Sequence, residues 1–345
     1  MKLLRFLLFP FAVLYDAITR IRNWFFNLGV LKSTSFDIPV IAVGNLSVGG
    51  TGKSPQIEYL IRLLKDDYKI VVLSRGYKRK TEGFQLVNDT HTAEDVGDEP
   101  LQFYKKFKND ITVAVDADRT NGIQQLLQKD IPPQVVLLDD AYQHRKVTAS
   151  SYILLTKYND LYVDDFVLPT GNLRESRRGA KRASVIVVTK CSENLSKAEQ
   201  EKIVRKIKPK SYQKVFFTTI AYDENLKGTE ELAISDLKGK EVLLVTGIAN
   251  PKPLLKFLEE KEVRFIHLNF PDHHNFTQQD ISTIKKAFDE LPSEQKIILT
   301  TEKDYMRLEG KIDNLNYISI KSKFLSEEKA FDSLVLEEIR RVKTK

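Results

Sequence analysis

Short runs of apolar, often β-branched residues recur along the chain, and each ends in a cluster of polar residues. The pattern appears in IPVIAVGN (38–45), YKIVVLSRGY (68–77), ITVAVDADR (111–119), QVVLLDDAYQH (134–144) and ASVIVVTK (183–190). A segment with apolar residues at helical spacing (positions 57, 60, 61 and 64) follows the first run. Strands that are apolar on both faces and alternate with helices predict a mostly parallel sheet covered by helices. Ligands of such sheets bind at the carboxyl ends of the strands, where these polar clusters fall.

A second α/β series begins later in the chain. After Lys208 the residues have extended character and few helix signals, and EVLLVTGIANP (241–251), VRFIHLNF (263–270) and KIILTTEKDYMRL (296–308) then resume the alternation. We therefore predict an α/β protein with a larger domain, a strand-rich connector and a second, smaller α/β lobe. The predicted boundaries are 31–210, 211–238 and 239–345.

Residues 1–30 differ from the rest of the chain in their pattern of apolar residues. The apolar run over residues 3–15 contains Arg5 and Pro10 and is shorter than the roughly 20 apolar residues that span a bilayer. It is not followed by the small-x-small cleavage site of a signal peptide. Apolar residues then continue at helical spacing: Leu14, Ile18, Ile21, Phe25 and Leu28. This pattern predicts a membrane-associating helix that lies on the bilayer surface. The alternative is a helix packed on the protein's own core.

The composition is that of a globular protein, with 345 residues, 42% hydrophobic and 29% charged, and a net charge of +7. The positive charge is compatible with an anionic partner such as a nucleic acid, a membrane surface or a phosphorylated substrate. Because the basic residues are dispersed and form no basic–aromatic array, we predict no nucleic-acid binding. The single cysteine, Cys191, excludes an internal disulfide.

The stretch VGNLSVGGTGKSPQ (43–56) resembles a phosphate-binding loop of the form G-x-x-x-x-G-K-[ST], with serine in place of the leading glycine. Such a loop binds phosphate through backbone N–H groups at a helix N-terminus, helped by a lysine. The leading position is the least tied to phosphate contact, so the serine should be tolerated. We predict that nucleotide phosphates bind to Ser47, Val48, Gly49, Gly50, Thr51, Gly52, Lys53 and Ser54. Lys53 supplies the charge, and Ser54 is a candidate Mg²⁺ ligand.

Paired carboxylates follow the apolar run at 135–138. Asp139 and Asp140 lie where a phosphate-binding protein needs a metal partner. Adjacent carboxylates repel each other unless they bind something, so we predict that they hold Mg²⁺ or order its surroundings.

Two further clusters carry potential acid–base groups. VGDEP (96–100) places Asp98 and Glu99 in a turn, and FPDHHNF (270–276) places His273 and His274 together in the second lobe. A carboxylate could accept a proton from a substrate hydroxyl while a histidine orients it. A solvated turn is the alternative for the histidine pair.

Nine motifs together carry a family resemblance over nearly the whole chain. They are VGNLSVGGTGKSP, LSRGYKR, VGDEP, DADR, LLDDAYQH, LPTGNLRES, VTGIANP, FPDHHNF and LTTEKDYMRL, in this order. The chain resembles the tetraacyldisaccharide 4'-kinase family of lipid A synthesis. The resemblance implies transfer of the γ-phosphoryl group of ATP to the 4'-hydroxyl of a lipid substrate, tetraacyldisaccharide 1-phosphate. It also implies a location at the cytoplasmic face of the inner membrane of Gram-negative bacteria. The implied fold is a P-loop lobe and a smaller α/β lobe, joined by a two-stranded hairpin, with the site between them.

The resemblance also implies roles for individual residues. Asp98 would be the base that acts on the sugar hydroxyl, and His273 would pair with it from the second lobe; motif position favours His273 over His274. Lys53 and Ser54 would hold phosphates and Mg²⁺. The other implied site residues are Asp139, Asp140 and Glu175 at the metal or its water shell, Glu99 and Gln143 nearby, and Arg75, Tyr77, Arg119 and Arg174 facing anionic groups of ATP or lipid.

The sequence departs from the family in one turn and leaves rival functions open. Ala141 stands where the family usually has glycine, so either this residue avoids positive φ or the turn is slightly less stable.

The main rival function is a switch ATPase or GTPase of the partitioning or metallochaperone type. Val48 replaces the signature lysine of the partitioning ATPases, and no clear N-K-x-D motif reads guanine. A DHH-type phosphoesterase would need further aspartates that the first lobe does not offer in the right contexts.

Overall fold

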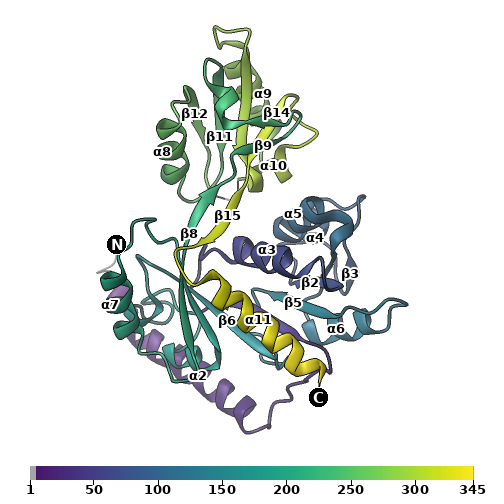
Figure 1. The fold of residues 1–345 in the computed structure, drawn as a ribbon, viewed down its shortest axis with the longest axis vertical. Coiled ribbons are helices and arrows are strands. Elements are labelled where there is room, and N and C mark those ends of the chain that lie inside the picture. The colour runs from purple at the N-terminus through teal and green to yellow at the C-terminus, as the bar shows by residue number, and fades with distance from the viewer. Residues whose placement is uncertain (1–4, 273, 345) are drawn as a thin grey trace.

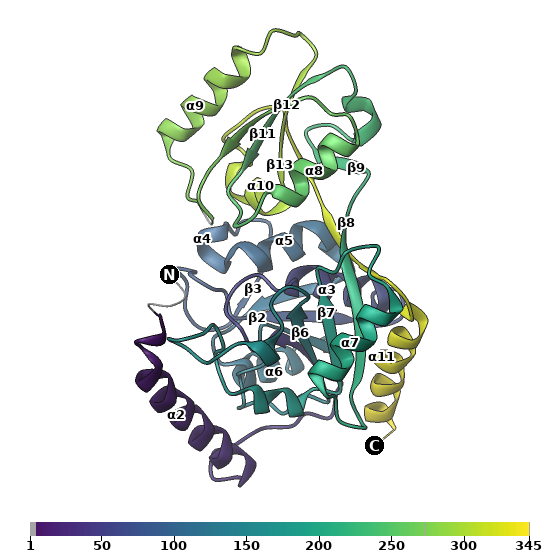
Figure 2. The ribbon, with the colours of Figure 1, turned by 90° about the vertical axis from the view of Figure 1, so that its left-hand side faces the viewer.

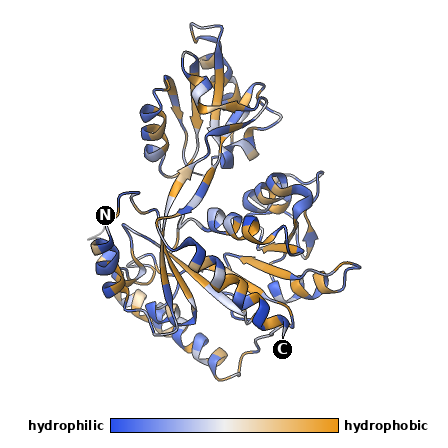
Figure 3. Cartoon of the chain, viewed as in Figure 1, coloured by the Kyte–Doolittle hydropathy of each residue, from blue (hydrophilic) through white to orange (hydrophobic). Residues whose placement is uncertain are grey.

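The computed structural model describes residues 5–272 and 274–344. Over these residues the chain forms two lobes, one built on a nine-stranded sheet and the other on a six-stranded sheet (Figure 1). Both sheets are mostly parallel and covered by helices, which confirms the predicted α/β class. Figure 3 shows mainly hydrophobic strands and helices of mixed character, as expected for strands buried on both faces.

The elements of the first lobe are α2 (Phe9–Asn27), β1 (Val40–Asn45), α3 (Lys53–Leu64), β2 (Ile70–Ser74), β3 (Gln85–Leu86), α4 (Ala93–Val96), α5 (Asp98–Phe107), η1 (Lys108–Asp110), β4 (Thr112–Val115), α6 (Arg119–Leu127), β5 (Val135–Asp139), β6 (Ser151–Lys157), η2 (Tyr162–Asp164), η3 (Arg177–Arg182), β7 (Val185–Thr189), α7 (Lys197–Ile207), β8 (Lys214–Tyr222), β15 (Ile320–Phe324) and α11 (Glu328–Lys343). The strand order is β15-β8-β7-β6-β1-β5-β2-β4-β3, with antiparallel pairing only at the edge strands β3 and β15. Strand β1 is therefore central, and the loop that follows it opens at the middle of the sheet.

Alternate residues of the central strands face two helical layers. Ile41 and Val43 of β1 face the core shared with α3, α5 and α11, whereas Val40 and Ala42 face α6. Helix α7 covers β6 and β7. The period-2 alternation of strand side chains therefore buries both faces of the sheet.

The second lobe contains β9 (Asn225–Gly228), β10 (Leu232–Ala233), η4 (Ile234–Leu237), β11 (Glu241–Thr246), α8 (Lys252–Glu260), β12 (Phe265–Asn269), α9 (Gln278–Asp289), β13 (Lys296–Thr301), α10 (Glu302–Leu308) and β14 (Leu315–Ile318). Its strand order is β10-β9-β14-β13-β11-β12. Val242 and Leu244 of β11 pack against α8, and Leu243 and Val245 pack on the side of α9 and α10.

The lobes are joined by β8 and β15, which pair antiparallel although they are far apart in sequence. Beyond β15 the chain returns to the first lobe, where Phe331, Val335 and Ile339 of α11 enter the core beside α3. The predicted division assigned all of residues 239–345 to the second lobe. In the structure α11 lies on the first lobe, because its apolar face completes that core.

Helix α2 lies along the outside of the first lobe (Figure 2). Its polar residues Tyr15 and Asn23 hydrogen-bond to the lobe, and Ala12 is its buried residue. Large apolar side chains are exposed on it, namely Phe11, Leu14, Ile18, Ile21 and Trp24, and Leu28 directly after it is exposed as well. This orientation contradicts the alternative of a helix packed on the protein's own core. Among the described helices, α2 included, none combines the length and apolarity needed to cross a membrane.

Three charged residues are buried where the lobes meet. Lys106 of α5 lies 2.7 Å from Glu58 of α3 and 2.8 Å from Glu302 of α10, and each side chain is at most 7% exposed. Removing one partner of a buried ion pair leaves an uncompensated charge away from water. The lysine therefore stabilises both the first lobe and its contact with the second.

We expect Lys106→Met to lower the free energy of unfolding by about 3–5 kcal/mol, because the buried carboxylate of Glu302 loses the ammonium beside it and that of Glu58 keeps Arg62, at 3.4 Å, as its counter-ion. The matched control is Lys105→Met, which removes a half-exposed pair with Glu309 on the same helix. Its expected effect is below about 1 kcal/mol. Urea denaturation of both variants measures the difference, and equal losses would contradict the buried role of Lys106.

Candidate active site

The loop after β1 has the backbone of a phosphate-binding loop. Gly49 and Gly52 have φ values of +97° and +87°, in the left-handed region where side chains are disfavoured. Ser47, at the position of the leading glycine, does not have a positive φ, and its backbone pairs with Leu173. Gly52 is the N-cap of the 12-residue helix α3, so the helix N-terminus opens onto the loop. The serine is thus accommodated without backbone strain.

Lys53 and Asp140 bring the loop and the end of β5 together. The Lys53 ammonium lies 3.5 Å from Asp140, which also accepts a hydrogen bond from Arg174 at 2.7 Å. Burial favours the protonated form of Asp140, but the positive charges of Lys53 and Arg174 outweigh burial and lower its pKa. Asp140 has the positive φ of this turn, +44°, so Ala141 avoids that conformation.

Asp139 is the last residue of β5 and is 3% exposed. Its Oδ2 atom accepts a hydrogen bond from Ser74 at 3.1 Å, and its buried Oδ1 atom has no hydrogen-bond partner among the described residues. Burial, followed by the negative charges of Glu99 and Asp140, raises the pKa of Asp139 to about 7. Arg119 lies behind it and donates to its backbone carbonyl at 3.4 Å; burial lowers the pKa of this arginine to about 10. A buried carboxylate oxygen without a donor is suited to a cation.

The raised pKa of Asp139 predicts that stability depends on pH. Between about pH 4 and 7 the folded protein holds a proton that the unfolded chain has released, so the free energy of unfolding falls as pH rises through this window. Asp139→Asn should flatten this dependence, as measured by urea denaturation at several pH values across the window. An unchanged slope would show that Asp139 is already ionised in the folded protein.

Asp98 and Glu99 begin α5, next to the phosphate loop. The Ser54 hydroxyl donates to Glu99 at 2.9 Å. Asp98 accepts hydrogen bonds from two nitrogens of Arg307 in α10, with 3.3 Å between Nε and Oδ1. Sequence analysis gave Arg307 no role, although the residue lies in the LTTEKDYMRL motif, because its partner is in the other lobe.

The two histidines of the FPDHHNF motif are His273 and His274. His273 lies outside the described residues, so its proposed pairing with Asp98 stays a prediction. His274 stacks on Phe270, with ring centroids 5.0 Å apart, and its Nε2 atom lies 3.0 Å from Asp280. His274 is thus held by residues of its own lobe, and the choice of His273 over His274 stays a prediction.

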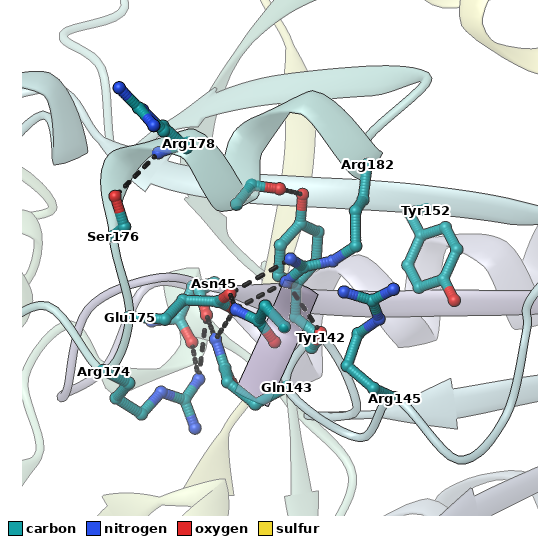
Figure 4. A network of polar contacts seen from close by, with 12 residues as sticks. Asn45, Tyr142, Gln143, Arg145, Tyr152, Arg174, Glu175, Ser176, Arg178 and Arg182 are labelled. Carbon is teal, nitrogen blue, oxygen red and sulfur yellow. Dashed lines mark hydrogen bonds and ion pairs between the residues drawn. The ribbon is translucent and has the colours of Figure 1, made fainter. Parts of the chain in front are cut away.

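Glu175 lies in a polar network beside α2 (Figure 4). Its carboxylate pairs with Arg182 at 2.5 Å and accepts hydrogen bonds from Gln143 at 3.1 Å and Asn23 at 2.9 Å. Gln143 also donates to the carbonyl of Asn45 at 2.8 Å. Both carboxylate oxygens are therefore engaged by protein groups, and a role for Glu175 in the metal's water shell stays a prediction.

Sequence reasoning missed three members of this network, Asn23, Asn45 and Arg182, and Asn23 of α2 had no signal of its own. Asn45 comes directly before the phosphate loop, and that position was the available signal. Arg182 is one of several cations in the segment 177–182, and nothing in the sequence distinguished it.

The remaining candidates are more dispersed. Arg75 and Tyr77 follow β2 and are exposed, Tyr77 by 69%. Across residues 5–272 and 274–344, no three His, Cys, Asp or Glu side chains cluster as a ready-made metal site.

Comparison with known proteins identifies the family. The family model of the tetraacyldisaccharide-1-P 4'-kinases, LpxK, matches residues 4–340. The chain belongs to this family. A tetraacyldisaccharide 4'-kinase of Flavobacterium johnsoniae is 55% identical over 343 residues, covering 99% of this chain and 98% of the relative. One of Bacteroides thetaiotaomicron is 45% identical over 313 residues, covering 87% and 82%.

The LpxK family also includes a solved structure with the same fold. A crystal structure of LpxK from Aquifex aeolicus in complex with ATP has a TM-score of 0.78 and 32% identity, covering 97% of this chain and 99% of that chain. Family membership confirms the predicted enzyme class, a phosphotransferase with an alcohol acceptor. It leaves the roles of the individual site residues as predictions.

Proposed function

We propose that the protein transfers the γ-phosphoryl group of ATP to the 4'-hydroxyl of tetraacyldisaccharide 1-phosphate, a lipid A precursor, at the cytoplasmic face of the inner membrane. The observation that carries the proposal is the hydrogen bond between Ser54 and Glu99. It brings the phosphate loop beside Asp98, the group proposed to act on the acceptor. The names of the relatives and the ATP in the Aquifex aeolicus structure support the substrates.

The nucleotide and Mg²⁺ would share the edge of the sheet after β1 and β5. The loop residues 47–54 would surround the phosphates, and Lys53 would neutralise part of their charge. Ser54, Asp139 and Asp140 would hold Mg²⁺, and the unpaired Oδ1 atom of Asp139 fits a hard cation that prefers oxygen ligands. When bound, the ion would neutralise charge that develops on the transferred group.

The acceptor hydroxyl would lose its proton to Asp98. This residue begins α5 and directly precedes Glu99, which accepts a hydrogen bond from Ser54, so it lies close to the phosphate loop in space although it is distant from the loop in sequence. Phosphoryl transfer depends mainly on positioning and electrostatics, and a carboxylate within reach of the hydroxyl meets the requirement for a base. His273 would orient this carboxylate from the second lobe.

The exposed apolar face of α2 supports docking on a membrane. Its inner face holds groups of the candidate site, since Tyr15 donates to the carbonyl of Arg174 and Asn23 donates to Glu175. A helix on the bilayer surface would therefore lie next to residues proposed to face the lipid. Basic side chains near α2 would interact favourably with the anionic headgroups of the bilayer.

We expect Ile18→Glu/Ile21→Glu to weaken binding to vesicles of phosphatidylethanolamine and phosphatidylglycerol at least about tenfold, because two apolar side chains no longer leave water. Sedimentation with vesicles measures the loss, and the single tryptophan, Trp24, reports insertion by a blue shift of its fluorescence. Ile266→Glu is the matched control, since Ile266 is 51% exposed on the second lobe. Equal binding by both variants would remove α2 from the docking surface.

The function is tested by incubating the protein with γ-labelled ATP, Mg²⁺, detergent and tetraacyldisaccharide 1-phosphate. Label should enter this lipid, and should not enter the same lipid already phosphorylated at the 4'-hydroxyl. ATP hydrolysis without labelled lipid would instead favour the switch-ATPase alternative.

A further inference from the structure

Helices α5 and α10 face each other across the boundary between the lobes (Figure 2). Ion pairs join α5 to α10 and to the residue that follows it: Lys106 with Glu302, Asp98 with Arg307, and Lys105 with Glu309. The pair of Asp98 with Arg307 differs from the others because Asp98 is the proposed base. A cation of the second lobe thus contacts the group that is proposed to start the reaction in the first lobe.

Arg307 is buried and also contacts an acidic residue of its own lobe. Its side chain is 8% exposed, and its Nη1 atom lies 3.7 Å from Asp304, which is fully buried. Asp304 in turn accepts hydrogen bonds from the backbone N–H of Gly247 at 2.8 Å and from the hydroxyl of Thr301 at 2.7 Å. The guanidinium therefore lies between Asp304 of its own lobe and Asp98 of the first lobe.

The contact with Asp98 is a two-point contact. The Nε and Nη2 atoms of Arg307 bond to different oxygens of the carboxylate, with 3.3 Å between Nε and Oδ1. Such a fork sets the plane of a carboxylate as well as its position. A guanidinium stays charged and has no acceptor, so it cannot take up the proton that leaves the acceptor hydroxyl.

We propose that Arg307 is a positioning residue for Asp98, which orients the carboxylate from the second lobe during phosphoryl transfer. The inference rests on the proposed function of Asp98 as the base. Arg307 thus acts in addition to the role proposed for His273, and because it belongs to the second lobe its effect on Asp98 depends on contact between α5 and α10. Arg307 acts through Asp98 and needs no contact with ATP or lipid.

A double-mutant cycle tests this relation. Arg307→Gln should lower kcat about a hundredfold, because misplacement of a catalytic group by about 1 Å has an effect of this size. The KM values for ATP and lipid should change less than about twofold, because Arg307 needs no contact with either substrate and their binding is retained. In the Asp98→Asn background the same substitution should cause no further loss, because its effect passes through the missing carboxylate.

Two more variants separate positioning from folding. Arg307→Lys keeps the charge but loses the fork, and should recover part of the rate, with kcat about tenfold below wild type. If thermal denaturation shows that Arg307→Gln does not fold, the rate of Arg307→Lys tests the proposal instead. Lys105→Gln removes another inter-lobe pair and should leave kcat within about twofold, because an exposed pair contributes little.

Each contrary result has a distinct meaning. A loss of equal size in the wild-type and Asp98→Asn backgrounds would overturn the proposal, because Arg307 would then act independently of Asp98. A rise in the KM for ATP at unchanged kcat would overturn it in favour of a nucleotide contact. If Asp98→Asn alone keeps full activity, the base assignment fails, and the inference fails with it.

Discussion

Replacing Lys53 with methionine is expected to lower kcat about a thousandfold, because no other group of the loop supplies a charge aimed at the transferred phosphate. Lys53 begins α3 and lies 3.5 Å from Asp140. Its ammonium is thus held where the phosphate loop and the end of β5 meet. Label transfer from γ-labelled ATP to the lipid, under saturating substrates, measures the effect.

The control for Lys53 is Lys65→Met, at the other end of α3. Lys65 pairs with Asp110 at 2.7 Å, away from the loop, and both side chains are partly exposed. This variant should keep wild-type kcat. If Lys53→Met retains more than about a tenth of the wild-type rate, the loop does not work as a phosphate-binding loop in the reaction.

Replacing Asp98 with asparagine is expected to lower kcat by about 10²–10⁴-fold, the usual contribution of a general base. Asparagine keeps the size of the side chain and can still contact Arg307, but it cannot accept the proton. Binding of ATP, followed by equilibrium titration, should be little changed. This combination separates lost chemistry from lost nucleotide affinity.

The control for Asp98 is Glu94→Gln in the preceding helix α4. Glu94 is 70% exposed and pairs with Lys80, so it shares the neighbourhood and the charge but faces solvent. We expect wild-type activity for this variant. Loss of ATP binding together with activity in Asp98→Asn would show that the carboxylate serves the nucleotide site instead.

Much of the fold could be predicted from local patterns. The apolar runs that became β1, β2, β5 and β7 are continuous because both faces of the sheet are covered, and this signal needs no knowledge of partners. The phosphate loop could also be predicted locally, because it is defined by glycines, a lysine and a serine at fixed spacing. The family resemblance then connected motifs that no local pattern could join.

Other features depend on contacts between distant residues. The helical spacing in α2 shows an apolar face, but only packing decides whether that face points to the core or to solvent. The apolar face of α11 is as regular, and it is buried in the first lobe because β15 carries the chain back there. The pairing of Asp98 with Arg307 and of Glu175 with Arg182 has no counterpart in sequence spacing.

The sequence by itself determined the α/β class, the phosphate loop, the paired carboxylates and the amphipathic character of α2, because each depends on the identity and spacing of neighbouring residues. The tertiary structure alone decided which lobe holds α11, which way α2 faces, that Asp140 rather than Ala141 takes the positive φ, and which cation meets Asp98. These depend on side chains that folding brings together across long stretches of chain. Their energies of contact are set by burial and charge, which spacing along the chain does not encode.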